Sequence, residues 1–170
     1  MHKLRDAPGY SEEGLRLELE RFTGKRKVYV LGLGNTDRAD DGAGTIVAEA
    51  LKKRFPRFSF SEQDGIEGVA LDISERGEAA VVIFVDAADM GAAPGTIRVI
   101  PSDRIRDTEI TTHRVAVALM RALLEKGGNT ALVIGIQPTV IEFRGKLSDS
   151  VRDAIGTLTD ILAEILARAD

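Results

Sequence analysis

The segment at residues 30–44 (VLGLGNTDRADDGAG) is the part of this chain that most constrains its fold. Residues 28–33 have the β-branched and apolar content of a parallel strand that is buried on both faces. Gly32 and Gly34 allow a sharp turn at the end of that strand. The apolar positions in residues 46–51 then recur at helical spacing. The pattern therefore predicts a strand, a tight polar loop and a helix, which is the repeating unit of an α/β sheet.

Asp40 and Asp41 fall at the mouth of the predicted helix. Ligands usually bind at this carboxyl end of the strands in an α/β sheet. A carboxylate there can ligate a metal, act as a base or cap the helix. Nucleotide binding is not expected, because the dinucleotide fingerprint needs glycine where the chain has Asp37, and the loop lacks the lysine of a P-loop. The loop carries three acidic side chains, Asp37, Asp40 and Asp41, and only one basic side chain, Arg38, so its net negative charge would also repel a pyrophosphate.

The composition excludes several classes of function. The chain has 170 residues, which is most simply one domain, and its net charge of −4 gives no basic surface for nucleic acid. No apolar run approaches the ~20 residues of a membrane span, and the N-terminus lacks the apolar core of a signal peptide. Because the chain has no cysteine, disulfides, thiolate ligands and cysteine nucleophiles are excluded. We therefore expect a cytoplasmic protein whose metal ligands, if it has any, are carboxylate, imidazole or backbone oxygen.

The order of predicted elements divides the chain into two parts. Residues 1–26 are highly charged and are interpreted as an N-terminal accessory segment, with a helix that starts at Ser11. Strands and helices then alternate over residues 27–170. The predicted strands lie at residues 27–33, 58–61, 79–85, 96–100 and 131–136. The predicted helices lie at residues 42–54 and 113–126 and from 148 onward, with a short helix or bend near residue 68.

This alternation predicts a parallel or mostly parallel sheet with helices on both faces. The strand at 96–100 is the expected exception. The loop around Pro94 and Gly95 is too short for a helical crossover, so this strand is expected to run antiparallel to its predecessor.

Three residues are candidates for the chemistry of the chain. Asp41 closes the first loop, Asp86 follows the third predicted strand, and His113 begins the helix at 113–126. Each has a simpler interpretation, respectively a helix cap, a turn residue and a partly exposed polar side chain. A helix N-terminus disfavours the imidazolium, which keeps the His113 ring neutral and able to bind a metal. In a doubly wound sheet the three side chains can meet at one edge, although their spacing alone does not require it.

Two further observations limit the mechanism. The chain has neither a G-x-S-x-G nucleophile elbow nor an H-E-x-x-H metal motif, and no serine lies in a pattern that would pair it with His113. Any hydrolysis is therefore expected to use water as the nucleophile. The segment Gly135-Ile136-Gln137-Pro138 ends the last predicted strand, and it forms either a simple turn or a wall of the same cleft.

These motifs, in this order, resemble the hydrogenase maturation proteases, the nickel-directed endopeptidases that trim the large subunit of NiFe hydrogenases. The resemblance covers about residues 27–166, so that 27–170 would be the protease domain. It rests on LGLGN at 31–35 with DDGAG at 40–44, VDA at 85–87, PGT at 94–96, TH at 112–113, and GIQP at 135–138 with GKLS at 145–148. The chain departs from the family in the residues that precede its first strand and in 64–68, which match the family's glycine-bearing loop only loosely.

The resemblance implies a three-layer α/β/α sandwich of the phosphorylase/hydrolase-like type, with a twisted, mainly parallel five-stranded sheet. It implies a metal-dependent endopeptidase that removes the C-terminal extension of a nickel-loaded hydrogenase large-subunit precursor, which would be its protein partner. Matched motif by motif, the residues that bind nickel in that family fall on Asp41, Asp86 and His113. The Ni²⁺ ion would be supplied by the precursor. Its role would be to orient the substrate, to polarise the scissile carbonyl or to activate water.

Two alternative functions remain at this point. The residues Gly32 to Asn35 also resemble the start of peptidyl-tRNA hydrolases, although the negative net charge disfavours an RNA substrate. A non-catalytic nickel-sensing assembly factor would use the same ligands without cleaving its partner. Cleavage of a precursor distinguishes the protease from the assembly factor. Binding of tRNA at low salt would identify a peptidyl-tRNA hydrolase.

Overall fold

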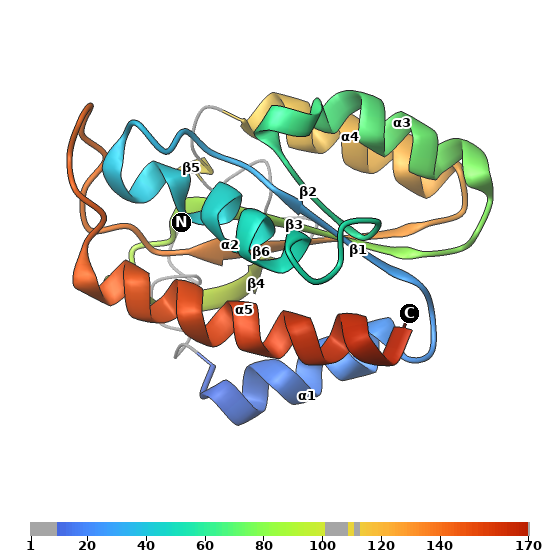
Figure 1. Ribbon diagram of the computed structural model, residues 1–170, viewed down its shortest axis with the longest axis horizontal. Coiled ribbons are helices and arrows are strands. Elements are labelled where there is room, and N and C mark those ends of the chain that lie inside the picture. The colour runs from blue at the N-terminus through green and yellow to red at the C-terminus, as the bar shows by residue number, and fades with distance from the viewer. Residues whose placement is uncertain (1–9, 101–108, 111–112, 170) are drawn as a thin grey trace.

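The computed structural model describes residues 10–100, 109–110 and 113–169 of the chain. Its centre is a sheet with the strand order β2-β1-β3-β6-β4 (Figure 1). The strands of this sheet are β1 (Val28–Gly32), β2 (Ser59–Ser61), β3 (Val81–Asp89), β4 (Ile97–Ile100) and β6 (Thr130–Ile136). A short strand, β5 (Glu109–Ile110), pairs with the end of β3. The predicted five-stranded, mainly parallel sheet is therefore confirmed.

The pairing of the strands aligns their carboxyl ends at one edge. β1, β2, β3 and β6 are parallel, with Gly32 opposite Val85 and Asp86 opposite Gly135. β4 runs antiparallel to β6, so its predicted direction is confirmed, but the strand beside it is β6 and not its predecessor β3. The loops that follow β1, β3 and β6 consequently leave the sheet side by side, which is the arrangement that forms binding sites in α/β folds.

Helices cover both faces of the sheet and complete the predicted three-layer sandwich (Figure 1). One face is covered by α2 and α5, with α1 packed against α5, and the other by α3 and α4. The α-helices are α1 (Glu12–Thr23), α2 (Ala43–Lys52), α3 (Ile66–Arg76), α4 (Arg114–Lys126) and α5 (Asp149–Ala169). Two 3₁₀ turns, η1 (Ala39–Gly42) and η2 (Glu62–Asp64), follow β1 and β2. None of the helices in the described ranges has the length and hydropathy needed to cross a membrane.

Two elements differ from the sequence expectation. The segment near residue 68, expected as a short helix or bend, is the three-turn helix α3, which starts after Gly65 and ends at Gly77, both with positive φ. Strand β3 continues past Val85 to Asp89, because Asp86 and Ala87 still pair with β6, and Ala88 pairs with β5. Asp86 is therefore a strand residue and not a turn residue.

The N-terminal helix α1 lies along the outer side of α5 (Figure 1). Its predicted start is confirmed, because Ser11 is the N-cap and its side chain accepts a hydrogen bond from the backbone N–H of Gly14. Leu15 and Leu19 are buried in the cluster formed with α2 and α5. An outer helix of this kind fits an accessory segment, while the division at residue 26 stays a prediction.

Helix α2 approaches the sheet so closely that glycine is required at the contact. A Cβ atom on Gly44 would lie 1.9 Å from the Val85 carbonyl oxygen, and one on Gly32 would lie 2.1 Å from the Gly44 carbonyl oxygen. Both clashes are with backbone, so no side-chain rotation can relieve them. This contact fixes η1, the turn just before α2, against the end of β3.

We expect Gly44→Ala to lower the free energy of unfolding by about 2 kcal/mol or more, because the extra carbon would push α2 away from β3. Gly156→Ala is the matched control, since Gly156 lies in α5 and a Cβ there would meet nothing within 4 Å. The control is expected to be neutral or stabilising by up to about 1 kcal/mol. Urea unfolding of the two variants measures both effects, and equal stability of the two would contradict the close-contact argument.

Candidate functional site

The turn η1 places two adjacent aspartates between β1 and α2. It depends on Gly34, which has φ +116°, and a Cβ on that residue would lie 1.8 Å from the Asp41 carbonyl oxygen. Only glycine fits there. Both aspartates are almost fully buried, with exposed fractions of 0% for Asp40 and 1% for Asp41. The surroundings of their carboxylates are nevertheless different.

The Asp40 carboxylate holds another segment of the chain in place. Its Oδ2 atom accepts hydrogen bonds from the backbone N–H groups of Thr139 and Val140, at 2.8 and 3.1 Å, and from the Ser148 hydroxyl at 2.8 Å. Its Oδ1 atom accepts a fourth, from the Ser148 backbone N–H at 2.8 Å. Burial alone would raise the pKa of Asp40, but these hydrogen bonds together hold the pKa below its ordinary value. We therefore assign Asp40 a structural role.

Asp41 has a much sparser environment. Its Oδ2 atom accepts one long hydrogen bond, 3.3 Å from the backbone N–H of Asn35. Asn35 lies in the same loop, and its own side chain is occupied by the backbone N–H of Asp37. A buried carboxylate with a single weak donor keeps acceptor capacity for a ligand, a water molecule or a cation. Asp41 is therefore the aspartate of the pair that is suited to chemistry.

Asp86 lies at the same edge of the sheet as Asp41. It is fully buried within β3, and η1 packs directly against β3. Val85 and Ala87 belong to the core cluster on the α2 and α5 face, whereas Phe84 and Ala88 belong to the cluster on the α3 and α4 face. Because successive side chains alternate along a strand, Asp86 faces α3 and α4.

His113 is the N-cap residue of α4, on that same face of the sheet. Its side chain is 25% exposed, and its Nδ1 atom lies 3.3 Å from Oε1 of Glu62 in η2. The sequence had given no sign of Glu62, because nothing in its local pattern distinguishes it from other surface acids. It follows β2, which places it at the carboxyl edge of the sheet with the other candidates.

The structure thus brings Asp41 and Asp86 to one edge and places His113 on the face toward which Asp86 points. Within residues 10–100, 109–110 and 113–169, no three His, Asp or Glu side chains are close enough together to hold a metal ion among themselves. Binding of a metal by Asp41, Asp86 and His113 together therefore stays a prediction.

Gln137 joins the loops after β3 and β6. Its Oε1 atom accepts hydrogen bonds from the backbone N–H groups of Met90 and Ala92, at 2.7 and 3.2 Å. Its Nε2 atom donates to Oδ1 of Asp89 at 3.2 Å. The 135–138 motif is therefore more than a simple turn, because its glutamine fastens the chain just beyond Asp86 to the end of β6. The sequence indicated the position of this residue but not these partners.

A family model described as "HycI: Hydrogenase maturation protease" matches residues 65–165. Among curated proteins, the chain is 31% identical over 132 residues to the hydrogenase 3 maturation protease of Escherichia coli K12, covering 76% of this chain and 84% of that protein. It is 30% identical over 150 residues to the hydrogenase expression/formation protein HoxM of Azotobacter vinelandii, covering 82% of this chain and 72% of that protein.

Solved structures show the same likeness. The solution structure of the endopeptidase HycI from Escherichia coli superposes with a TM-score of 0.69 at 28% identity, covering 81% of this chain and 90% of that one. The crystal structure of a NiFe hydrogenase maturation protease HycI from Thermococcus kodakarensis also gives a TM-score of 0.69, at 26% identity, covering 88% of this chain and 99% of that one. The likeness therefore extends over more than four fifths of this chain.

Proposed function

Because this chain belongs to the hydrogenase maturation protease family and is an endopeptidase, we propose that it removes the C-terminal extension of a nickel-loaded NiFe hydrogenase large-subunit precursor. The observation that carries the proposal is the pair of buried aspartates, Asp41 in the turn after β1 and Asp86 within the neighbouring strand β3, in a fold shared with these proteases. The family match favours this function over that of a peptidyl-tRNA hydrolase.

In the proposed mechanism the nickel ion is part of the substrate. The precursor's own ligands hold the ion, and Asp41, Asp86 and His113 complete its coordination. Carboxylate and imidazole are suitable donors for nickel, and a chain without cysteine leaves thiolate ligands to the partner. His113 turns Nδ1 toward Glu62, so Nε2 is the ring nitrogen available to the substrate.

The nucleophile is proposed to be water. The chain has no cysteine to act as a nucleophile. Among the described residues, no serine forms a hydrogen bond with His113, which would be needed to activate a serine nucleophile. A carboxylate with the sparse surroundings of Asp41 can accept a proton from an attacking water molecule. This mechanism forms no covalent acyl intermediate.

The experiment that tests the proposed function compares two preparations of one precursor, with and without nickel. Incubation with the protein is expected to shorten only the loaded precursor, by the mass of its C-terminal extension, as read by mass spectrometry. Inhibitors directed at serine and cysteine proteases are expected to have no effect, because neither nucleophile is used. Equal cleavage of the nickel-free precursor would contradict nickel recognition, and a trapped acyl-enzyme would contradict attack by water. Binding without any cleavage would support the assembly-factor alternative.

A further inference from the structure

An exposed apolar cluster lies on the segment that connects β6 to α5, here called the rim segment (residues 139–147). Val140 and Ile141 are each 37% exposed, and Phe143 is 65% exposed. The Arg144 guanidinium lies 5.4 Å from the centre of the Phe143 ring and covers part of it. Single exposed apolar residues are common, but three within four positions of one short segment are a concentration of the kind found at interaction sites.

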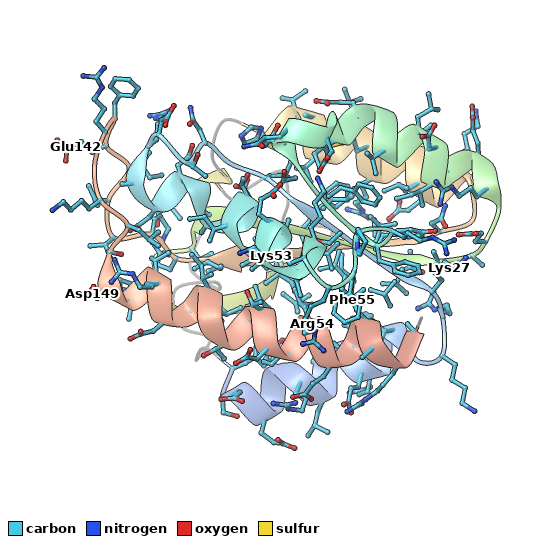
Figure 2. The ribbon with its side chains drawn as sticks, viewed as in Figure 1. Lys27, Lys53, Arg54, Phe55, Glu142 and Asp149 are labelled. Carbon is cyan, nitrogen blue, oxygen red and sulfur yellow. The ribbon has the colours of Figure 1, made fainter. Side chains whose placement is uncertain are left out.

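The rim segment is held firmly despite its exposure. Thr139 and Val140 donate to the Asp40 carboxylate, as described above, and the Val140 carbonyl accepts from the Asp40 backbone N–H at 3.2 Å. Further along, the Arg144 backbone N–H donates to the Asp37 carbonyl at 2.7 Å. The outer part of the segment, where Glu142 is labelled in Figure 2, projects away from the sheet. A prearranged apolar surface loses little conformational entropy when a partner binds to it.

The anchors of the rim segment belong to the same stretch of chain as Asp41. Residues 37–40, which hold the rim, immediately precede Asp41. Val140, one member of the cluster, is hydrogen-bonded to Asp40, the residue next to Asp41, so a protein that presents a peptide to Asp41 would lie close to the rim segment. A second copy of this chain on the cluster would compete with the precursor for this region, so that occupant does not suit an active enzyme.

We propose that Val140, Ile141 and Phe143 form a docking surface for an apolar patch of the precursor protein, beside the peptide that is cut. This inference rests on the proposed function and adds to it a specificity-determining contact outside the catalytic residues. Exposed charged residues of both signs, Glu142, Arg144 and Lys146, lie within and directly after this stretch of the sequence. Protein interfaces likewise combine apolar side chains with polar and charged ones.

The test uses the full-length protein and the nickel-loaded precursor. Phe143→Ser is expected to raise both KM and the Kd for the precursor roughly tenfold, as for an interface residue that carries much of the binding energy, with kcat within about twofold. Leu119→Ser is the matched control, because Leu119 is also a large exposed side chain, 67% exposed, but lies on α4. It is expected to leave KM, Kd and kcat unchanged.

The possible outcomes are distinguishable. If Phe143→Ser keeps the wild-type KM and Kd, or if Leu119→Ser raises them equally, the docking surface is refuted. Sedimentation that shows a wild-type dimer and a Phe143→Ser monomer, with KM unchanged, would assign the cluster to a second copy and also refute it. A wild-type protein that binds the precursor but never cleaves it contradicts the proposed function alone, because the Kd comparison still tests the docking surface.

Discussion

Asp41→Asn is expected to abolish cleavage of the nickel-loaded precursor while leaving the protein folded. Replacing the carboxylate by an amide removes a negative charge and a proton acceptor, and loss of one essential catalytic group commonly lowers kcat by roughly a thousandfold or more. The stability should change by less than about 1 kcal/mol, because Asp41 accepts one long hydrogen bond, from Asn35, that an asparagine oxygen can also accept. Rates from mass spectrometry and the free energy of unfolding from urea titration measure the two effects.

Asp37→Asn is the matched control for this variant. Asp37 is an exposed acid in the same loop, and its contact with the rim segment uses only its backbone carbonyl. The control should therefore keep wild-type activity and stability. If Asp41→Asn retained activity, or unfolded about 2 kcal/mol more easily than the control, Asp41 would be a structural residue.

Asp40→Asn is expected to have the opposite effect and to destabilise the protein by about 3 kcal/mol or more. Both carboxylate oxygens of Asp40 accept hydrogen bonds, four in total, from N–H and O–H groups. Asparagine replaces one of these oxygens by an NH₂ group, which would then face at least one donor. Hydrogen bonds to a charged group contribute about 1.5–3 kcal/mol each. Urea unfolding at pH 7 measures the loss, and a variant as stable as Asp41→Asn would contradict the structural assignment.

The same carboxylate predicts a dependence of stability on pH. The pKa of Asp40 is lowered on folding from its ordinary value of 3.8, so its stabilising contribution is complete above that value. The contribution is lost as the pH falls from about 3.8 through the lower pKa of the folded state. Wild-type stability should therefore fall more steeply than that of Asp40→Asn in this range, and parallel curves would contradict the argument.

The contrast between Asp40 and Asp41 shows what the sequence could and could not predict. Periodicity, glycines and strand ends were enough to predict the layers, the parallel strands and the edge at which the acids gather. The sequence could not separate the two aspartates, because their difference depends on hydrogen bonds to Thr139 and Ser148, about a hundred residues further along the chain. The contact of His113 with Glu62 is non-local in the same way.

The role of Gln137 in joining two loops could not be predicted from the sequence, for a related reason. Its place after β6 was visible, but its partners belong to the loop after β3, and pairing between those strands had to be known first. Strand β3 was predicted too short, because Asp86 looks like a strand terminator when its neighbours in the sheet are unknown.

The fastening of the loops by Gln137 and Asp40 has a consequence for the timing of the reaction. The segments after β1, β3 and β6 are tied to one another by side chains, and these hydrogen bonds restrain their movement relative to one another. Among the described residues, these tied loops are therefore not suited to act as a lid that opens and closes during turnover. For the proposed reaction we therefore expect the arrival of the precursor's tail at this edge of the sheet, and its departure after the cut, to be slow steps.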